Sequence, residues 1–246
     1  MRIFIWLALV TLVAFGCAPT YVPNVRNSPL FTKGGEVQGS MQWGNGFEGQ
    51  AAVSITNHIG VMGNILYADR ERFDPDDYDD YHKHLFYEGG IGYYTNDDLW
   101  CFEVFAGYGR GEGSSKNEFL GFDAPAPATG KYERYFIQPA FGLNKKVMHV
   151  GFVMRVSVVD FTAYSDDQQI SFTVRESPKV FFEPAVVGRV NLADNKLFFT
   201  FQGGWSSAMS SDVYFKHRRF QFGSGIGFRF GSIGRNGVVQ PKSSRE

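Results

Sequence analysis

The sequence predicts an all-β protein: an antiparallel up-and-down transmembrane β-barrel of about ten strands. Apolar and polar side chains alternate along most of the chain, and short connections alternate with long ones, as in membrane barrels. No run reaches the roughly 20 apolar residues that a membrane-spanning helix needs. The 246 residues include 29 glycines and 17% aromatic residues, which suits a glycine-kinked, aromatic-rich sheet. We therefore expect one domain whose strands cross a membrane.

The N-terminus carries an export signal. Residues 1–16 resemble a secretory signal, with Arg2 before an apolar stretch that ends at a small residue. The four letters that end at Cys17, AFGC, resemble the site at which lipoprotein signal peptidase cuts, so we predict a lipid on Cys17. Phe15 stands where a small residue is usual, and the alternative is a cut by ordinary signal peptidase nearby. Residues 17–35 contain three prolines and no periodicity, and we expect a lipidated, extended tether.

Period-two alternation begins at Glu36 and marks a barrel domain over residues 36–230, followed by a C-terminal tail over 231–246. The strands are predicted at residues 36–43, 47–56, 58–68, 84–94, 99–110, 132–143, 147–159, 179–191, 196–205 and 218–230. Short links follow the second, fourth, sixth and eighth strands, and long links follow the third, fifth, seventh and ninth. With short turns in the periplasm and long loops outside, an even strand number places both chain ends in the periplasm.

Two prolines interrupt predicted strands. Pro139 and Pro184 each lie within an alternating segment, where a closed barrel has no free edge to accept a residue without a backbone N–H. We expect a bulge or a local kink at each proline.

The apolar face of the strands carries aromatic residues near both strand ends, a pattern that a bilayer favours at its two interfaces. These residues are Trp43, Tyr67, Tyr108 and Trp205 at one end, and Tyr93, Trp100 and Phe141 at the other. The opposite face holds mostly glycine and small polar residues, which suit a narrow lumen. We expect the apolar face to point outward, into lipid.

The last predicted strand, FQFGSGIGFRF, has the polar-x-Gly-x-x-apolar-x-apolar spacing of the C-terminal signal that outer-membrane insertion machinery reads. The matching residues are Gln221, Gly223, Ile226 and Phe228, and Gly225, Phe228 and Phe230 nearly repeat the motif. Through these features the chain resembles the outer-membrane β-barrel protein superfamily over residues 36–230. The resemblance implies the fold and the outer-membrane bilayer, with no particular activity. The tail after Phe230 departs from it, because members typically end at the aromatic residue.

The predicted lumen carries five residues of each charge. They are Glu36, Glu48, Glu88, Glu103 and Glu183, with Arg134, Arg155, Lys179, Arg189 and Arg229. Because buried charges are tolerated only when they are paired, we expect a cross-linked, occluded interior. The alternative is a small-solute pore lined by these charges.

The link DRERFDPDDYDDY is rich in carboxylates and is followed by His82 and His84. Its order does not match a calcium-binding EF-hand loop, because no glycine stands at the turning position and no glutamate closes the loop. The two histidines have no cysteine or third histidine near them in sequence to complete a zinc site. We expect a solvated external loop, no metal and no cofactor.

An outer-membrane hydrolase is a further alternative, with Asp69, His84, Asp160 and Ser165 as the available residues. Nothing in their local sequence forms a nucleophile elbow or a recognisable acid pair, so we predict that the chain is not an enzyme. The other cysteine, Cys101, lies within an alternating segment and is predicted to pack in the wall.

The net charge of −1 offers no field that would hold nucleic acid. The function predicted is therefore a structural or interaction role for an outer-membrane barrel lipoprotein that presents its loops and tail to other envelope components.

Overall fold

The computed structural model describes residues 19–72, 80–97, 99–116, 127–145, 147–166, 169–172, 177–192, 196–210 and 212–231. The predicted signal, Cys17, most of the carboxylate-rich link and the tail beyond residue 231 lie outside these ranges. All regular structure in the described residues is β. None of them belongs to a helix long and apolar enough to cross a membrane.

Twelve strands follow one another along the described chain. They are β1 (Val37–Trp43), β2 (Phe47–Ser54), β3 (Ile59–Arg72), β4 (Asp80–Asn96), β5 (Trp100–Lys116), β6 (Ala128–Asn144), β7 (Met148–Asp166), β8 (Gln169–Phe172), β9 (Lys179–Leu192), β10 (Leu197–Trp205), β11 (Ser207–Ala208) and β12 (Phe220–Phe230). Ten of them form the wall, while β8 and β11 are short additions that pair with β7 and β9. The predicted ten strands are confirmed.

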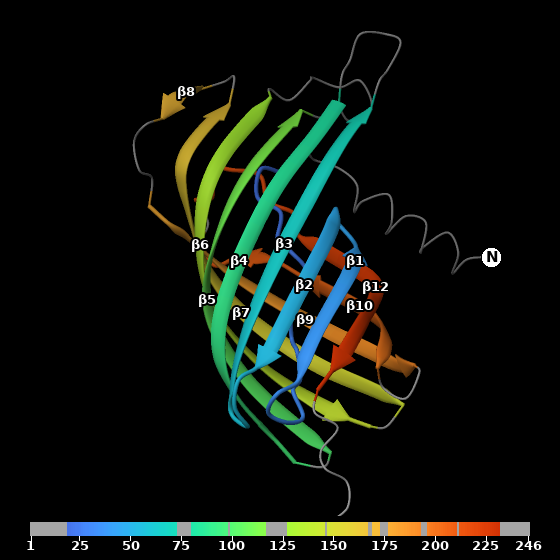
Figure 1. The fold of residues 1–246 in the computed structure, drawn as a ribbon. Helices are drawn as coiled ribbons and strands as arrows, with labels where there is room; N and C mark the ends of the chain where they lie inside the picture. The colour runs from blue at the N-terminus through green and yellow to red at the C-terminus, as the bar shows by residue number, and fades with distance from the viewer. Residues whose placement is uncertain are drawn as a thin grey trace, which may run out of the picture.

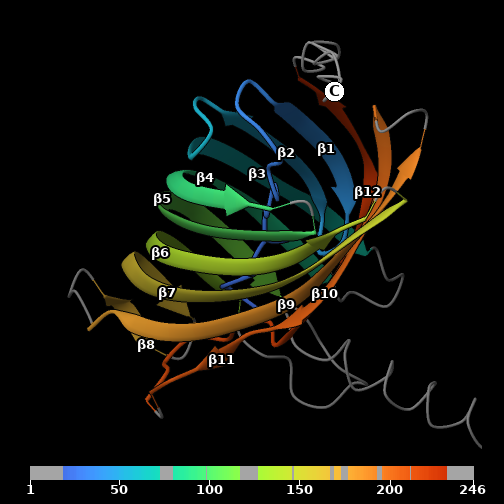
Figure 2. The same ribbon diagram turned by 90° about the horizontal axis from the view of Figure 1, so that it is seen from below.

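The wall is a closed antiparallel barrel. Each wall strand pairs with its neighbours in order, β7 pairs directly with β9, and β12 pairs with β1 to close the ring. Figure 2 looks along the barrel and shows the strands forming a ring around the blue N-terminal segment. Closure leaves no unpaired strand edge in the wall, which is what a barrel needs within lipid.

The two ends of the barrel differ. The links after β2, β4, β6 and β9 are short and lie together at one end, here called the short-turn end; the links after β3, β5, β7 and β10 lie at the other, the long-loop end. Strands β3 to β7 are 14 to 19 residues long, whereas β1, β2 and β10 have 7 to 9. The wall therefore rises on one side of the long-loop end and is low at β12, β1 and β2 (Figure 1).

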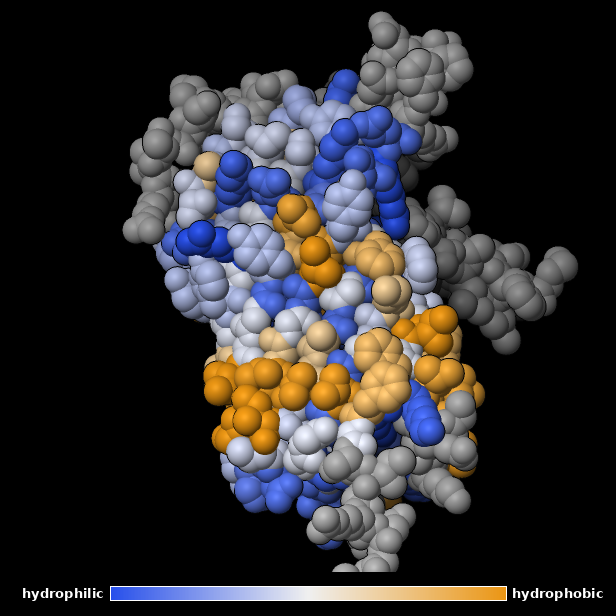
Figure 3. All heavy atoms as spheres, viewed as in Figure 1, coloured by the Kyte–Doolittle hydropathy of each residue, from blue (hydrophilic) through white to orange (hydrophobic). Residues whose placement is uncertain are grey.

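The apolar face points outward, as the alternation predicts. Along β4 and β5, exposed apolar side chains such as Ile91 and Phe102 alternate with inward-facing positions, and the buried side chains there include glutamates. The aromatic residues predicted for two belts lie on this outer face; Trp43 and Trp205 end their strands at the long-loop end, and Trp100 begins its strand at the short-turn end. Figure 3 shows hydrophobic side chains gathered in a band, with hydrophilic side chains chiefly above and below it.

A bulge or a local kink was expected at each of the two prolines, and the strand register shows no bulge at either. The pairing of β6 with β7 lapses at Pro139 and resumes in the same register, and the pairing of β9 with β10 ends just after Pro184 and resumes in the same register with β11. Each proline still pairs on its other side. The missing N–H is thus accommodated by a local gap in one ladder. The register shift lies instead at Lys131/Tyr132.

The described chain starts at the long-loop end and finishes at the short-turn end. The backbone N–H of Thr20 donates to the carbonyl of Lys216 in the link before β12, whereas Gly231 lies against Glu36 at the start of β1. Both chain ends were expected at the same end of the barrel; the ends of the described residues lie at opposite ends.

Candidate functional site: the filled lumen

The lumen is occupied by the chain's own N-terminal segment, residues 20–32, here called the plug. Its residues from Thr20 to Phe31 are all buried. It runs from the long-loop end to the short-turn end, where residues 33–35 turn into β1, with Gly35 at a φ of 75° that favours glycine. The expected tether is extended, as predicted, but it lies inside the barrel.

All ten wall strands hydrogen-bond to the plug. The wall residues are Gln38 of β1, Gln50 of β2, Asn64 of β3, Glu88 of β4, Glu103 of β5, Gln138 of β6, Arg155 of β7, Arg189 of β9, Gln202 of β10 and Gln221 of β12. Apart from a parallel bridge between Tyr21 and His217, the plug pairs with no strand in the described structure, so most of its backbone groups need side-chain partners. The wall supplies them from every side.

Five glutamines perform most of this pairing, because each donates its side-chain amide to a different plug carbonyl. Gln38, Gln50, Gln138, Gln202 and Gln221 bind the carbonyls of Pro29, Val25, Asn27, Arg26 and Pro23 respectively. Gln202 also accepts the Arg26 backbone N–H at 2.7 Å, so its amide pairs with the plug backbone as a neighbouring strand would. A buried glutamine offers both a donor and an acceptor, which an extended segment with prolines requires.

Two lumen glutamates bind plug N–H groups. Glu48 accepts from the backbone N–H of Val25 at 2.7 Å, and Glu103 accepts from the backbone N–H of Leu30 at 2.8 Å and from the Ser28 hydroxyl at 2.5 Å. The Arg189 guanidinium donates to the carbonyls of Ser28 and Pro29. These charged groups satisfy the plug backbone and are themselves satisfied by it.

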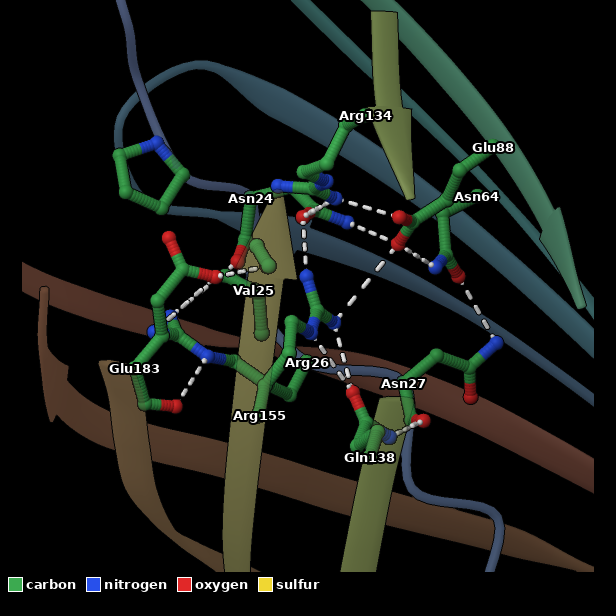
Figure 4. A network of polar contacts seen from close by, with 12 residues as sticks. Asn24, Val25, Arg26, Asn27, Asn64, Glu88, Arg134, Gln138, Arg155 and Glu183 are labelled. Carbon is green, nitrogen blue, oxygen red and sulfur yellow. Dashed lines mark hydrogen bonds and ion pairs between the residues drawn. The ribbon is translucent and has the colours of Figure 1, made fainter. Parts of the chain in front are cut away.

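A buried ionic network crosses the middle of the lumen (Figure 4). Glu88 forms ion pairs with Arg134 and, at 3.7 Å, with Arg155. Asn24 of the plug lies between them: its amide donates to Glu88 at 2.8 Å, and its oxygen accepts from Arg134 at 2.6 Å and from Arg155 at 2.9 Å. Arg155 also donates to Gln138. One plug side chain thus connects three charges of the wall.

The plug also brings a charge of its own. Arg26 is buried, and its guanidinium lies 4.0 Å from a carboxylate oxygen of Glu183 and donates to the Glu183 carbonyl at 3.3 Å. The carboxylate further accepts from Tyr21 of the plug at 2.9 Å and from Ser157 at 2.9 Å. Glu183 therefore has its charged partner in the plug.

Apolar layers lie on both sides of this polar middle. At the long-loop end the link between β11 and β12 folds inward, so that Phe215 packs 4.4 Å from Phe161 and within the same cluster as Tyr21 and Val22 of the plug. At the short-turn end Phe31 packs against Tyr94 with ring centroids 5.2 Å apart. These layers exclude water from the charged centre, which strengthens its electrostatic contacts.

Wall glycines leave room for the plug. A side chain at Gly60 would meet the Phe31 ring at 2.5 Å, and one at Gly142 would meet a Leu30 methyl at 2.9 Å. Beside Asn27 and Arg189 the remaining cavity is about 10 Å³, no more than one water molecule occupies. The described lumen is packed along the plug.

The ten charged residues predicted for the lumen are buried there, except that Arg229 is partly exposed. The expected cross-linking of wall charges is present in part, because Glu88 pairs with Arg134 and Arg155 of the wall. Glu36 pairs with Arg229 at 3.0 Å, but Lys179 pairs with Asp212 of a link at 3.0 Å. That hydrogen bond holds the pKa of the exposed Asp212 carboxyl below its usual range. Most of the others depend on the plug.

The four residues considered for hydrolysis do not meet. Asp69 and His84 lie on adjacent strands, but their side chains point to opposite faces of the wall. Asp69 is exposed and pairs with Lys83, whereas His84 is buried against Tyr132. Asp160 and Ser165 lie on β7, three strands from β4, which corresponds to about 14 Å. Within the described part of the chain no nucleophile and base are brought together from this set.

The histidine pair lies in the upper lumen, with the rings of His82 and His84 stacked 6.1 Å apart. No group of three or more metal-ligating side chains occurs among the described residues. Cys101 is buried as predicted, with its thiol directed to the Phe31 carbonyl at 3.5 Å.

The plug is the feature that sequence reasoning missed. A signal for it exists: Tyr21, Val22, Leu30 and Phe31 are large apolar residues that a solvated tether does not need. The inward-facing glutamines of the wall are a second signal, because a lumen filled only by paired charges would not require them.

Comparison with protein-family models and with curated proteins gave no match. Among the solved structures to which the chain is similar are two autotransporter domains. The translocator domain of autotransporter NalP from Neisseria meningitidis is 11% identical, with a TM-score of 0.47, over 81% of this chain and 90% of that chain. The β-domain of the Bordetella autotransporter Brka is 12% identical, with a TM-score of 0.38, over 81% of this chain and 100% of that chain. Strand pairing and burial within the chain itself establish that it is a closed ten-stranded antiparallel barrel, with the apolar exterior and polar interior of outer-membrane β-barrel proteins.

Proposed function

We propose that this protein is a closed outer-membrane barrel with a structural or interaction role, anchored by a lipid on Cys17, and that it conducts no solute. The observation that carries the proposal is the plug, which forms hydrogen bonds with all ten wall strands. A lumen filled by hydrogen-bonded chain offers no path for a solute, which disfavours the small-solute pore.

Location in the outer membrane is supported by the exterior of the barrel. Exposed apolar side chains encircle the wall, and the large ones include Ile65, Ile91, Ile137, Phe199 and Ile226. Such a surface is unstable in water, and a closed barrel is the only β structure that satisfies its backbone within lipid. The long-loop end then faces outward, as in other barrels with short periplasmic turns.

The tall side of the wall is the part we propose for interaction. Beyond the apolar band, β3 to β6 expose Asp69, Lys83, Glu112 and Lys131, which form ion pairs with neighbours on adjacent strands. Charges of both signs on a rigid sheet suit contact with another polar surface. We propose no catalytic role, because the four residues considered for hydrolysis do not lie together.

Planar-bilayer conductance tests the closed lumen. The full-length purified protein should show no steady open channel. A variant in which Asn24, Val25 and Arg26 are replaced by glycine retains the chain connection but removes the side chains at mid-lumen, and it should conduct if folded. A steady channel in the unaltered protein would refute the proposal.

The interaction role needs a separate test. A photo-cross-linking residue at position 131, whose lysine side chain is 71% exposed, should capture an envelope protein in cells. The same residue at Ile91 in the apolar band should capture lipid. Equal protein capture at both positions would remove the tall wall from the proposal.

A further inference from the structure

The strand β3 rises above the closed ring on one side. Its pairing with β2 ends where Tyr67 lies opposite Phe47, whereas its pairing with β4 continues to Arg72, opposite Asp80. Figure 1 shows β3 extending well past the top of β2. Tyr67 is exposed on the outer face and is one of the aromatic residues predicted for the lipid interface. Residues 68–72 therefore lie beyond the apolar band, with a strand neighbour on one side only.

Alternation of the backbone shows which groups face the open side. Successive residues of an antiparallel strand direct their N–H and C=O groups to opposite sides. The carbonyl of Ile59 accepts from Ile55, the residue that follows β2, so the odd-numbered residues of β3 face β2 and the even-numbered ones face β4. The register with β4 has no shift, so Asp69 and Glu71 direct both backbone groups to the side on which β2 has ended. These four groups form no hydrogen bond with another described residue.

The other side of the same tall sheet is covered by the chain itself. β9 pairs with β7 only as far as Val159. Above that point β8 pairs with β7, through Tyr164 with Phe172 and Asp166 with Gln169. The fold thus adds a short strand to one side of the tall sheet, and among the described residues it adds none to the open side of β3.

The charges beside this edge determine which strand fits it. The exposed side chains of Asp69 and Glu71 point outward and pair with Lys83. A second copy of β3, aligned outer face to outer face, would place acidic residues opposite acidic residues. Like charges directly opposite each other destabilise a sheet. The edge therefore disfavours pairing with itself.

The inner face of the edge is positively charged. Arg70 points to this face, and burial together with the nearby Arg70 lowers the pKa of Arg218. Neither arginine pairs with an acidic residue in the described part of the chain. A segment that has basic side chains outward and an acidic side chain inward is complementary to both faces.

We propose that the open edge of β3, at Asp69 and Glu71, is a strand-addition site for an extended segment of another envelope protein. The segment has basic side chains opposite Asp69 and Glu71 and an acidic side chain opposite Arg70. Backbone hydrogen bonds give such a contact its affinity, and side chains give it specificity. The inference rests on the interaction role in the proposed function, and it names the surface and the kind of partner.

Hydrogen exchange of the full-length protein in lipid nanodiscs, measured by NMR at single amides, tests the edge. In the protein alone, the amides of Asp69 and Glu71 should exchange much faster than that of Arg70, which faces β4. The probe is a synthetic peptide in which lysine, glutamate and lysine, flanked by threonines, lie opposite residues 71, 70 and 69. At about 1 mM, the weak end of specific binding, it should slow exchange of both edge amides by at least about tenfold.

The matched control is the same peptide with N-methyl groups on its two lysines, which keeps every side chain and removes the donors that pair with the edge. It should leave the exchange rates unchanged. In the protein, Glu71→Pro removes an N–H that faces the open side, where proline is tolerated, and should abolish the effect of the peptide on Asp69. Glu71→Ala also loses the carboxylate but keeps the N–H, and it should retain that effect. The heat-dependent shift in gel mobility checks that each variant is folded.

Three results would overturn the inference. Edge amides already protected in the protein alone would show that another part of the chain, or a second copy, covers the edge. Equal slowing by the N-methylated peptide would show that the backbone of the peptide does not pair with β3, and no slowing by either peptide would show that the edge accepts no strand. Each of these results is distinguishable from failure of the proposed interaction role, which the cross-link at position 131 tests separately.

Discussion

Replacing Asn24 with leucine removes three hydrogen bonds from the centre of the lumen at nearly constant side-chain volume. The amide bonds Glu88 at 2.8 Å, Arg134 at 2.6 Å and Arg155 at 2.9 Å. A hydrogen bond to an ionised group contributes about 1.5–3 kcal/mol, so three independent bonds would contribute roughly 5–9 kcal/mol.

The full sum is not expected, because the wall residues keep other partners. Glu88 retains Arg134 and accepts from Asn64, and Arg155 retains its two bonds to Gln138. Contributions within one network are not additive. We therefore expect Asn24→Leu to lower the free energy of unfolding by about 3–5 kcal/mol, the cost typical of breaking a buried charged network.

Guanidinium unfolding of the barrel in lipid vesicles measures this change, with gel mobility reporting the folded fraction. Asn57→Leu is the matched control: this exposed side chain accepts one backbone N–H, from Gly34 at 3.0 Å, so its loss should cost under about 1 kcal/mol. If Asn24→Leu costs no more than Asn57→Leu, Asn24 does not link the plug to the wall, and the structural account of the lumen is wrong.

Three further substitutions test other parts of the molecule. Phe31→Ala removes the ring that packs against Tyr94 and should lower the free energy of unfolding by about 3–5 kcal/mol; unchanged stability would contradict that packing. Gly60→Val should displace the Phe31 ring, which a side chain there would meet at 2.5 Å, and so lower the free energy of unfolding; unchanged stability would show that the glycine is not needed for the plug. Ile91→Arg in the apolar band should cost about 2–4 kcal/mol in a bilayer, whereas Thr129→Arg beyond the band should cost under about 0.5 kcal/mol; equal costs would contradict the membrane position.

The wall could be predicted from the sequence because its pattern is local and repeated. Period-two alternation, turn residues and strand length each depend on a few neighbouring residues, and they agree along the chain. The predicted start of β9 matches the observed Lys179, and the predicted ends of β1 and β10 match Trp43 and Trp205.

The strand ends beyond the apolar band were missed for a physical reason. β4 begins at Asp80 and β5 continues to Lys116, in segments where both faces are polar. Alternation disappears there because neither face contacts lipid, although the ladder continues. The expectation of a bulge or kink at the prolines failed for a different reason. Their missing N–H groups fall at gaps in one ladder, and the position of such a gap depends on the three-dimensional strand pairing and not on the local sequence.

The plug could not be predicted in the same way, because most of the contacts that hold it are with residues far away in the sequence. Tyr21 bonds Glu183, 162 positions later in the chain. The segment has no periodicity because its residues contact strands on several sides of the lumen and not one partner strand. Sequence reasoning correctly identified the lumen charges and expected an occluded interior, but it looked for their partners within the wall alone.

The same contacts indicate that the plug is a permanent part of the fold and not a gate that opens transiently. Withdrawal would remove the backbone donors of Glu48 and Glu103 and the charged partner of Glu183 together. Water would have to enter between two apolar layers to replace them, and leaving even one such carboxylate buried without a partner costs several kcal/mol. The residues between the plug and β1 also form a link of only four residues, 33–36, which leaves no slack for sliding. The barrel and its N-terminal segment must therefore fold as one unit, with the segment enclosed before β12 pairs with β1.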